Sequence, residues 1–250
     1  HKFVFLYLEA VWCHWCHVMQ LETFSDPAVR KALKHDYLAT RVDHDANPEL
    51  AGRYRDYGWP ALVFLAPDGS EIVKRAGYIA PADFVRLLGA IVQDPSPELA
   101  APALPAAGRD SLSAHQRAVL LRQHEQSYDA QMGGLKGAQK YLDRDSVEYA
   151  LVHAAVPVER HQAEQSLTAA LGLIDPVWGG VYQYSTGGDW VHPHFEKIMR
   201  VQAGYLRLYA LAQGTLGRAA DHTAAQAIRD YLLNFLRAPE GAFYVSQDAD

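Results

Sequence analysis

The stretch that decides the fold is Val11-Trp12-Cys13-His14-Trp15-Cys16-His17-Val18-Met19, which holds the only two cysteines of the sequence. An apolar run, residues 3–8, leads into it, and a segment suited to a helix leads out. A Cys-x-x-Cys pair between a strand and a helix places the first sulfur over the unpaired N–H groups of the helix start. The helix dipole stabilises a thiolate there. The stretch is therefore typical of a thiol–disulfide exchanger.

The positions of the two cysteines predict different roles. Cys13, at the exposed start of the helix, is the expected nucleophile, and Cys16, deeper in the first turn, would resolve the mixed disulfide. A protonated His14 would stabilise the reduced thiolate and make the disulfide a better oxidant. Pro60 would help to seat a partner strand if the bond before it is cis. The residues expected to tune access, redox poise or docking are Trp12, His14, Trp15, His17, Trp59 and Pro60.

Two other interpretations of the cysteines remain open. They could be inert core residues, or they could bind a metal together with His14 or His17. Structural zinc requires four ligands, and the sequence has no second cysteine pair. We therefore favour the dithiol, with no cofactor beyond a Cys13–Cys16 disulfide and with a protein dithiol or disulfide as partner.

The pattern around the cysteines predicts one α/β domain, residues 1–93. Apolar or alternating runs predict strands, and capped amphipathic segments predict helices, in the order β-α-β-α-β-β-α. The first helix should run to about Phe24, and Ser25 should cap the next. The predicted strands are residues 3–8, 37–43, 61–65 and 71–76, and the later helices are 28–34, 49–57 and 81–93.

The remainder of the chain changes character. Residues 94–112 are rich in proline and alanine and are predicted to be a linker. Residues 113–250 are almost wholly helical in pattern, and Ser113 with Gln116 forms a capping box. The predicted helices are 113–127, 143–155, 158–174, 195–213 and 221–237. Glycine-marked loops separate them, which suggests a repeating α-hairpin array.

Several motifs together resemble a known family. The string CHWCHVM of residues 13–19, Gly58-Trp59-Pro60 and Pro193-His194-Phe195-Glu196-Lys197 are similar to the YyaL-like and spermatogenesis-associated thioredoxin-domain family. The resemblance implies a thioredoxin-like domain followed by an α/α toroid similar to sugar epimerases and six-hairpin glycosidases. Gly179-Gly180 with the residues after it, and residues 247–250, match further signatures of that family.

The sequence also departs from the family pattern. Lys140-Tyr141-Leu142 replaces the family's Lys-Phe-Pro, so the preceding glycine loop could differ. Tyr7 stands where many thioredoxins have a buried carboxylate, and Glu9 is the nearest acid. Proton transfer to the resolving thiol is therefore not explained by the sequence.

The helical half offers a second candidate site. Two imidazoles, a carboxylate and an ammonium group gather in residues 192–197, predicted to be a helix start facing a toroid cavity. Such groups could perform acid–base chemistry on a sugar ligand, or they could cap a helix while the aromatic residues fill the core. The candidate cavity residues are Trp178, Tyr182, Tyr184, Trp190, His192, His194, Glu196, Lys197, Asp248 and Asp250.

Composition narrows the possible partners. The formal net charge of −6 gives no electrostatic reason to expect nucleic acid or an anionic membrane. No apolar run approaches the length of a membrane span, and we expect a cytoplasmic chain.

Besides a thiol–disulfide exchanger and a sugar-active protein, a third hypothesis is a non-enzymatic protein that uses the surface of the α/β domain and the cavity only for binding. Because a closed six-hairpin ring needs more helices, we expect an uncovered apolar face among Leu206, Leu208, Leu232, Leu233 and Phe235.

Overall fold

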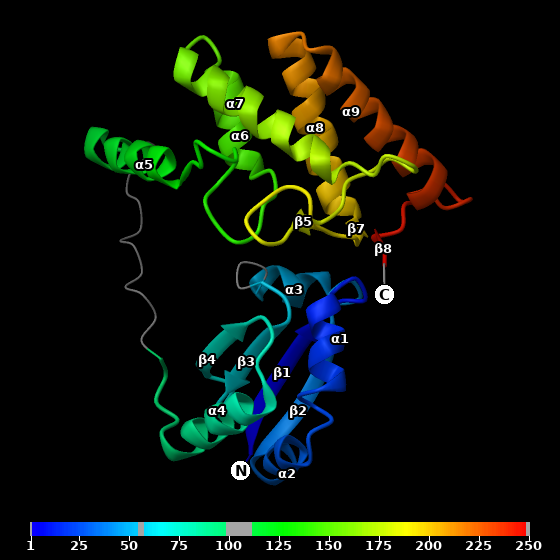
Figure 1. Cartoon of the computed structure of the whole chain (residues 1–250). Helices are drawn as coiled ribbons and strands as arrows, with labels where there is room; N and C mark the ends of the chain where they lie inside the picture. The colour runs from blue at the N-terminus through cyan, green and yellow to red at the C-terminus, as the bar shows by residue number, and fades with distance from the viewer. Residues whose placement is uncertain (1, 55–57, 99–111, 249–250) are drawn as a thin grey trace. The chain divides into compact units, whose positions relative to one another are not determined.

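The computed structural model describes residues 2–54, 58–98 and 112–248. The chain divides into two compact units, with the boundary between residues 108 and 109. Figure 1 shows a mixed sheet with helices in the first unit and a mainly helical second unit. The predicted order of an α/β domain followed by a helical region is confirmed. Most of the predicted linker lies outside the described residues.

The first unit is a four-stranded sheet between helices. The strands lie in the order β2-β1-β3-β4, with β1 and β2 parallel and the other pairs antiparallel. The elements are β1 (Phe3–Glu9), α1 (His14–Leu21), α2 (Pro27–Asp36), β2 (Tyr37–Asp43), α3 (Pro48–Tyr54), β3 (Ala61–Leu65), β4 (Glu71–Ala76) and α4 (Pro81–Gln93).

The alternation of side chains along the strands explains why helices cover both faces. Phe5 of β1 and Phe64 of β3 stack at 4.8 Å on one face, where Phe84 of α4 joins them. Leu8 and Val63 point to the other face and pack with Tyr54 of α3. Because side chains alternate with period two, each strand supplies both layers of the core.

Two predicted helix boundaries in this unit were wrong. The first helix ends at Leu21 instead of reaching Phe24. Asp26, and not Ser25, caps the second helix, because its carboxylate accepts hydrogen bonds from the amides of Ala28 and Val29. Ser25 instead donates to the carbonyl of Gln20. An aspartate directly before proline at the first helical position is an equally good cap.

The second unit contains the helices α5 (Ala114–Ser127), α6 (Arg144–Val152), α7 (Pro157–Ala169), α8 (Met199–Leu216) and α9 (Ala219–Tyr231). A 3₁₀ turn follows α7 and a π turn follows α9. Both hydrogen bonds of the predicted capping box at Ser113 are present. Short strand pairs, β5 (Tyr184–Ser185) with β6 (Pro193–His194) and β7 (Lys197–Ile198) with β8 (Ser246–Gln247), connect the loops. Among the described residues, no helix is both long and apolar enough to span a membrane.

The expected uncovered apolar face is only partly present. Leu208 and Leu232 are 0% and 7% exposed, because they join the core between α8 and α9. Leu206 is partly buried against the same core. Leu233 and Phe235 are 46% and 41% exposed. Of the five residues named in the expectation, the exposed ones therefore lie on the π turn and not on α8.

Candidate functional site

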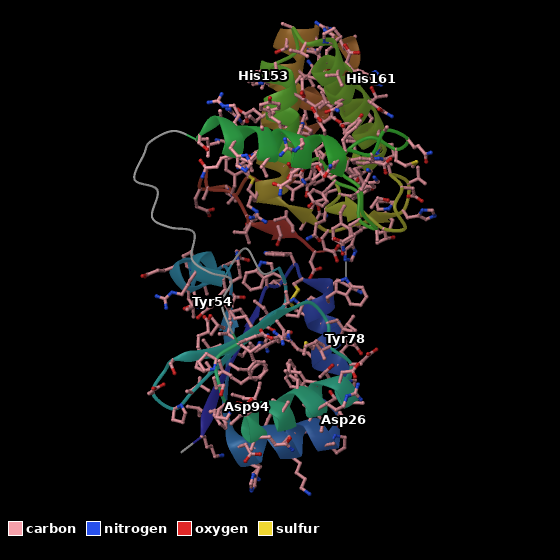
Figure 2. All side chains as sticks on the ribbon, turned by 90° about the vertical axis from the view of Figure 1, so that its left-hand side faces the viewer. Asp26, Tyr54, Tyr78, Asp94, His153 and His161 are labelled. Carbon is pink, nitrogen blue, oxygen red and sulfur yellow. A yellow bond between two sulfur atoms is a disulfide. The ribbon has the colours of Figure 1, made fainter. Side chains whose placement is uncertain are left out.

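The cysteine pair lies where β1 passes into α1. Cys13 is the N-cap residue of α1, and its Sγ accepts a hydrogen bond from the amide of Cys16 at 3.1 Å. The two cysteines form a disulfide with their Cα atoms 5.2 Å apart, which Figure 2 shows as a yellow bond. The N-terminal sulfur is thus held against the positive end of the helix, as the spacing predicted.

The expectation that Cys13 is exposed was wrong. Cys13 is 5% exposed and Cys16 is completely buried. The solvent-exposed surface next to the disulfide is formed by neighbouring residues, since Val11 is 59% and Trp15 43% exposed. The Trp15 ring lies 6.0 Å from that of Tyr78, so an aromatic rim borders the disulfide.

Three side chains that the sequence did not indicate as neighbours, Asp45, His44 and Trp59, pack around Trp12. The indole Nε1 of Trp12 donates to Asp45 Oδ2 at 3.1 Å, and His44 Nδ1 lies 2.8 Å from Asp45 Oδ1. The ring of His44 makes edge contacts with both Trp12 and Trp59. The available signal was the polar pair directly after β2, at the edge of the sheet where β1 also ends.

Tyr7 and Glu9 lie beneath the cysteine helix. The hydroxyl of Tyr7 donates to the carbonyl of Cys16 at 2.9 Å, and burial raises the pKa of Tyr7 above its ordinary range. The Glu9 side chain is 5% exposed and is held by Gln20 and Arg41. Tyr7 therefore supports the helix as a neutral donor, and the nearby carboxylate is tied to two other groups.

The remaining predicted residues of the first unit lie on α1 or directly before β3. The Trp59–Pro60 bond is cis, Pro60 is buried, and Trp59 is partly buried. His14 contacts the ring of Trp15, and both His14 and His17 are partly buried on α1. Trp12, His14, Trp15 and His17 are thus neighbours of the cysteines in the chain, and the ring of Trp59 lies 6.3 Å from that of Trp12. Their individual roles stay predictions.

The predicted helix start at residues 192–197 was wrong. These residues form β6, a short link and β7, and α8 begins only at Met199. Pairing with β5 and β8 explains the difference, because the backbone of both strands is satisfied by neighbouring loops. His194 still lies 3.1 Å from Glu196 and its ring contacts Tyr184. His192 is exposed and lies 2.7 Å from Asp189.

The contacts of Lys197 are those of a residue that stabilises the fold. Its Nζ lies 2.6 Å from Asp175 Oδ2 and 2.9 Å from the carbonyl of Gly179. The ammonium also lies over the rings of Tyr182 and Tyr231. Lys197 is 5% exposed, so it holds the glycine loop from inside the core.

The other predicted cavity residues differ in burial. Trp190 is buried and donates to the carbonyl of Met132, whereas Trp178 is 62% exposed and contacts Phe235. Asp248 is exposed after β8, and Asp250 lies outside the described residues. A role in carbohydrate chemistry therefore stays a prediction.

The two glycine loops share one set of aspartate contacts, and whether the first differs from the family's loop stays a prediction. In each, an aspartate accepts from two backbone amides through Oδ1 and from a lysine through Oδ2. Asp129 pairs with Lys140 as Asp175 pairs with Lys197, both at 2.6 Å. The two loops therefore share an Asp–Lys contact, and the repeating α-hairpin array stays a prediction.

Comparison with known proteins identifies relatives of the N-terminal domain and of the whole chain. Residues 1–93 match the model of a family described as Thioredox_DsbH, protein of unknown function, DUF255. Spermatogenesis-associated protein 20 of Homo sapiens is 26% identical over 294 residues, covering 100% of this chain but only 37% of that protein. The thiol:disulfide interchange protein DsbD of Pseudomonas fluorescens is 36% identical over 73 residues, 28% of this chain and 12% of that protein.

A solved thioredoxin from Thermus thermophilus, 30% identical, aligns with a TM-score of 0.34 over 36% of this chain and 74% of its own. The family model covers the whole sheet together with the cysteine pair. Residues 1–93 of this chain therefore match the thioredoxin-like DsbH family, as the resemblance predicted, and hold a disulfide oxidoreductase-type pair, Cys13 and Cys16.

Proposed function

We propose that this domain performs reversible thiol–disulfide exchange with protein partners, with Cys13 as the attacking sulfur and Cys16 as the resolving one. The observation that carries the proposal is the hydrogen bond from the Cys16 amide to Cys13 Sγ at the start of α1. A sulfur that already accepts an amide N–H and faces the helix dipole is suited to hold negative charge.

The exchange follows from this geometry. In the reduced protein, the Cys13 thiolate attacks one sulfur of a partner disulfide, and the partner's second sulfur leaves as a thiolate. The Cys16 thiol loses its proton and attacks Cys13 Sγ, which closes the disulfide seen here and releases the partner with two thiols. The reverse sequence oxidises a partner dithiol and leaves both cysteines reduced.

Because the cysteine pair is buried, a partner protein would first contact the exposed side chains beside it. Val11 and Trp15 are exposed beside the disulfide, and Pro60 is the candidate seat for an extended partner segment. The hydrogen bond to Asp45 fixes the position of the Trp12 ring next to Cys13. The partner class that fits is a protein segment with an accessible disulfide or dithiol.

The test compares the full chain with Cys13→Ser, Cys16→Ser and the double variant in an insulin-type reductase assay. The Cys13→Ser and double variants should lose turnover, because neither contains the attacking sulfur. Cys16→Ser should accumulate a partner mixed disulfide that is visible on a non-reducing gel. Unchanged turnover of the double variant would reject the proposal, since no other cysteine exists in the chain.

A further inference from the structure

A cavity of about 310 Å³ lies in the helical domain between the first turns of α6 and α8. Its lining comes from the residues that lead into α6, from one residue beside β5, and from the first turns of α8. It shares none of the residues predicted for the carbohydrate site. Its volume lies at the lower end of the range of small-ligand pockets, roughly 300–1,000 Å³.

Two arginines line this cavity from different helices. Arg200, in the first turn of α8, is exposed and forms no ion pair with any residue in the described parts of the chain. Arg144, at the start of α6, has its Nε 3.2 Å from Asp145, but the two side chains are 61% and 85% exposed. An ion pair so exposed is weak and can be exchanged for another anion.

Within the described residues, no ion pair joins Arg200 to the acidic residues of the lining. Asp143 accepts the amide of Ser146 at 3.0 Å as the cap of α6, and Asp145 belongs to the exposed pair with Arg144. A guanidinium group donates several hydrogen bonds in a planar array that matches carboxylate and phosphate oxygens. The cavity therefore offers the donors for an oxyanion from two sides.

The rest of the lining suits the uncharged part of a small molecule. Gln183 supplies an amide, and the rings of Tyr141 and Tyr205 supply apolar surface. The hydroxyl of Tyr205 accepts the amide of Leu142 at 2.6 Å, which holds that ring in place. A Cβ atom added to Gly204 would meet nothing within 4 Å, so the wall formed by α8 is open there.

We propose that this cavity binds a small organic oxyanion, a phosphate monoester or a carboxylate. Arg200 and Arg144 hold the anionic group, while Gln183 and the two tyrosine rings contact the neutral part. The site is independent of the cysteine pair, because every lining residue belongs to the helical domain.

The test is isothermal titration calorimetry on the full chain with four probes: ribose 5-phosphate, ribose, inorganic phosphate and gluconate. Ribose 5-phosphate or gluconate should bind, and whichever binds more tightly identifies phosphate or carboxylate as the preferred anionic group. Ribose should not bind, and inorganic phosphate should bind more weakly than the organic anion. If neither organic anion binds, or if inorganic phosphate binds as tightly as both, the proposal is wrong.

Two pairs of variants connect binding to the cavity. Arg200→Gln should weaken binding roughly 10-fold or more, as expected for a lost charge-assisted hydrogen bond. Arg229→Gln removes the same charge from an exposed position on α9 and should leave affinity unchanged. Gly204→Leu should abolish binding by filling the cavity, whereas Gly214→Leu, on the same helix and equally open, should not. Equal effects within either pair would overturn the proposal.

Discussion

The Nζ of Lys197 lies 2.6 Å from Oδ2 of Asp175, and each side chain is only 6% exposed. The other carboxylate oxygen of Asp175 accepts the amides of Val177 and Trp178. Burial alone would raise the pKa of Asp175, but the hydrogen bonds from Lys197 and these amides outweigh it and lower the pKa. A single aspartate thus joins the glycine loop to β7, the short strand directly before α8.

Lys197→Met should destabilise the protein by about 3–5 kcal/mol, because it leaves the Asp175 carboxylate buried without its counter-charge. Denaturant unfolding followed by circular dichroism measures the change. Arg160→Met is the matched control, since its pair with Glu164 is 45% and 36% exposed and should cost less than about 0.5 kcal/mol. Adding Asp175→Asn to Lys197→Met should recover part of the loss. Equal losses for Lys197→Met and Arg160→Met would contradict the argument.

The equivalent pair in the first loop makes stability depend on pH. The hydrogen bond from Lys140, together with those from the amides of Met132 and Gln131, lowers the pKa of Asp129 from 3.8 to about 2. Because the folded state has the lower pKa, the pair contributes fully above about pH 4, and its contribution disappears as the pH falls towards about 2. Asp129→Asn should therefore be less stable than the natural protein at neutral pH, and urea midpoints should converge between pH 4 and 2. A gap that stays constant over that range would show that the charge of Asp129 is not the cause.

Local patterns allowed most of the α/β domain to be predicted. The strands Tyr37–Asp43, Ala61–Leu65 and Glu71–Ala76 and the helix Pro81–Gln93 have the predicted ends. Each combines a clear hydrophobic period with a proline, a turn or a charged boundary. The Cys-x-x-Cys spacing likewise identified the pair and its position at a helix start.

Features that depend on distant contacts were not predictable. Trp12 contacts Asp45, 33 residues further along the chain, and only the parallel pairing of β1 with β2 brings the two residues to the same edge of the sheet. Residues 193–198 lack a helix because β6 and β7 pair with strands formed by other loops, one of them near residue 246. Burial of Cys13 also depends on tertiary packing, so the helix start alone misled the exposure prediction.

Gly180→Ala should destabilise the protein more than Gly217→Ala, although both glycines have a positive φ, 75° and 70°. A Cβ at Gly180 would lie 2.5 Å from the ring of Tyr231, whereas one at Gly217 would meet nothing within 4 Å. The conformational cost of about 1–2 kcal/mol is common to both, and overpacking adds about 1–3 kcal/mol at Gly180. Thermal and denaturant unfolding of the two variants measure the difference. Equal losses would mean that the Tyr231 ring moves aside without cost.

Asp45→Ala should destabilise the N-terminal domain by about 1–3 kcal/mol, because the buried indole N–H of Trp12 loses its acceptor. Asp45→Asn should cost less, since its amide oxygen can still accept that hydrogen bond. Asp68→Ala, in an exposed turn, is the control for loss of a carboxylate. Urea unfolding gives the stabilities, and the insulin-type assay should show slower exchange for Asp45→Ala, because Trp12 forms the wall beside Cys13. If Asp45→Ala loses stability but exchanges at the natural rate, Trp12 serves the fold and not the reaction.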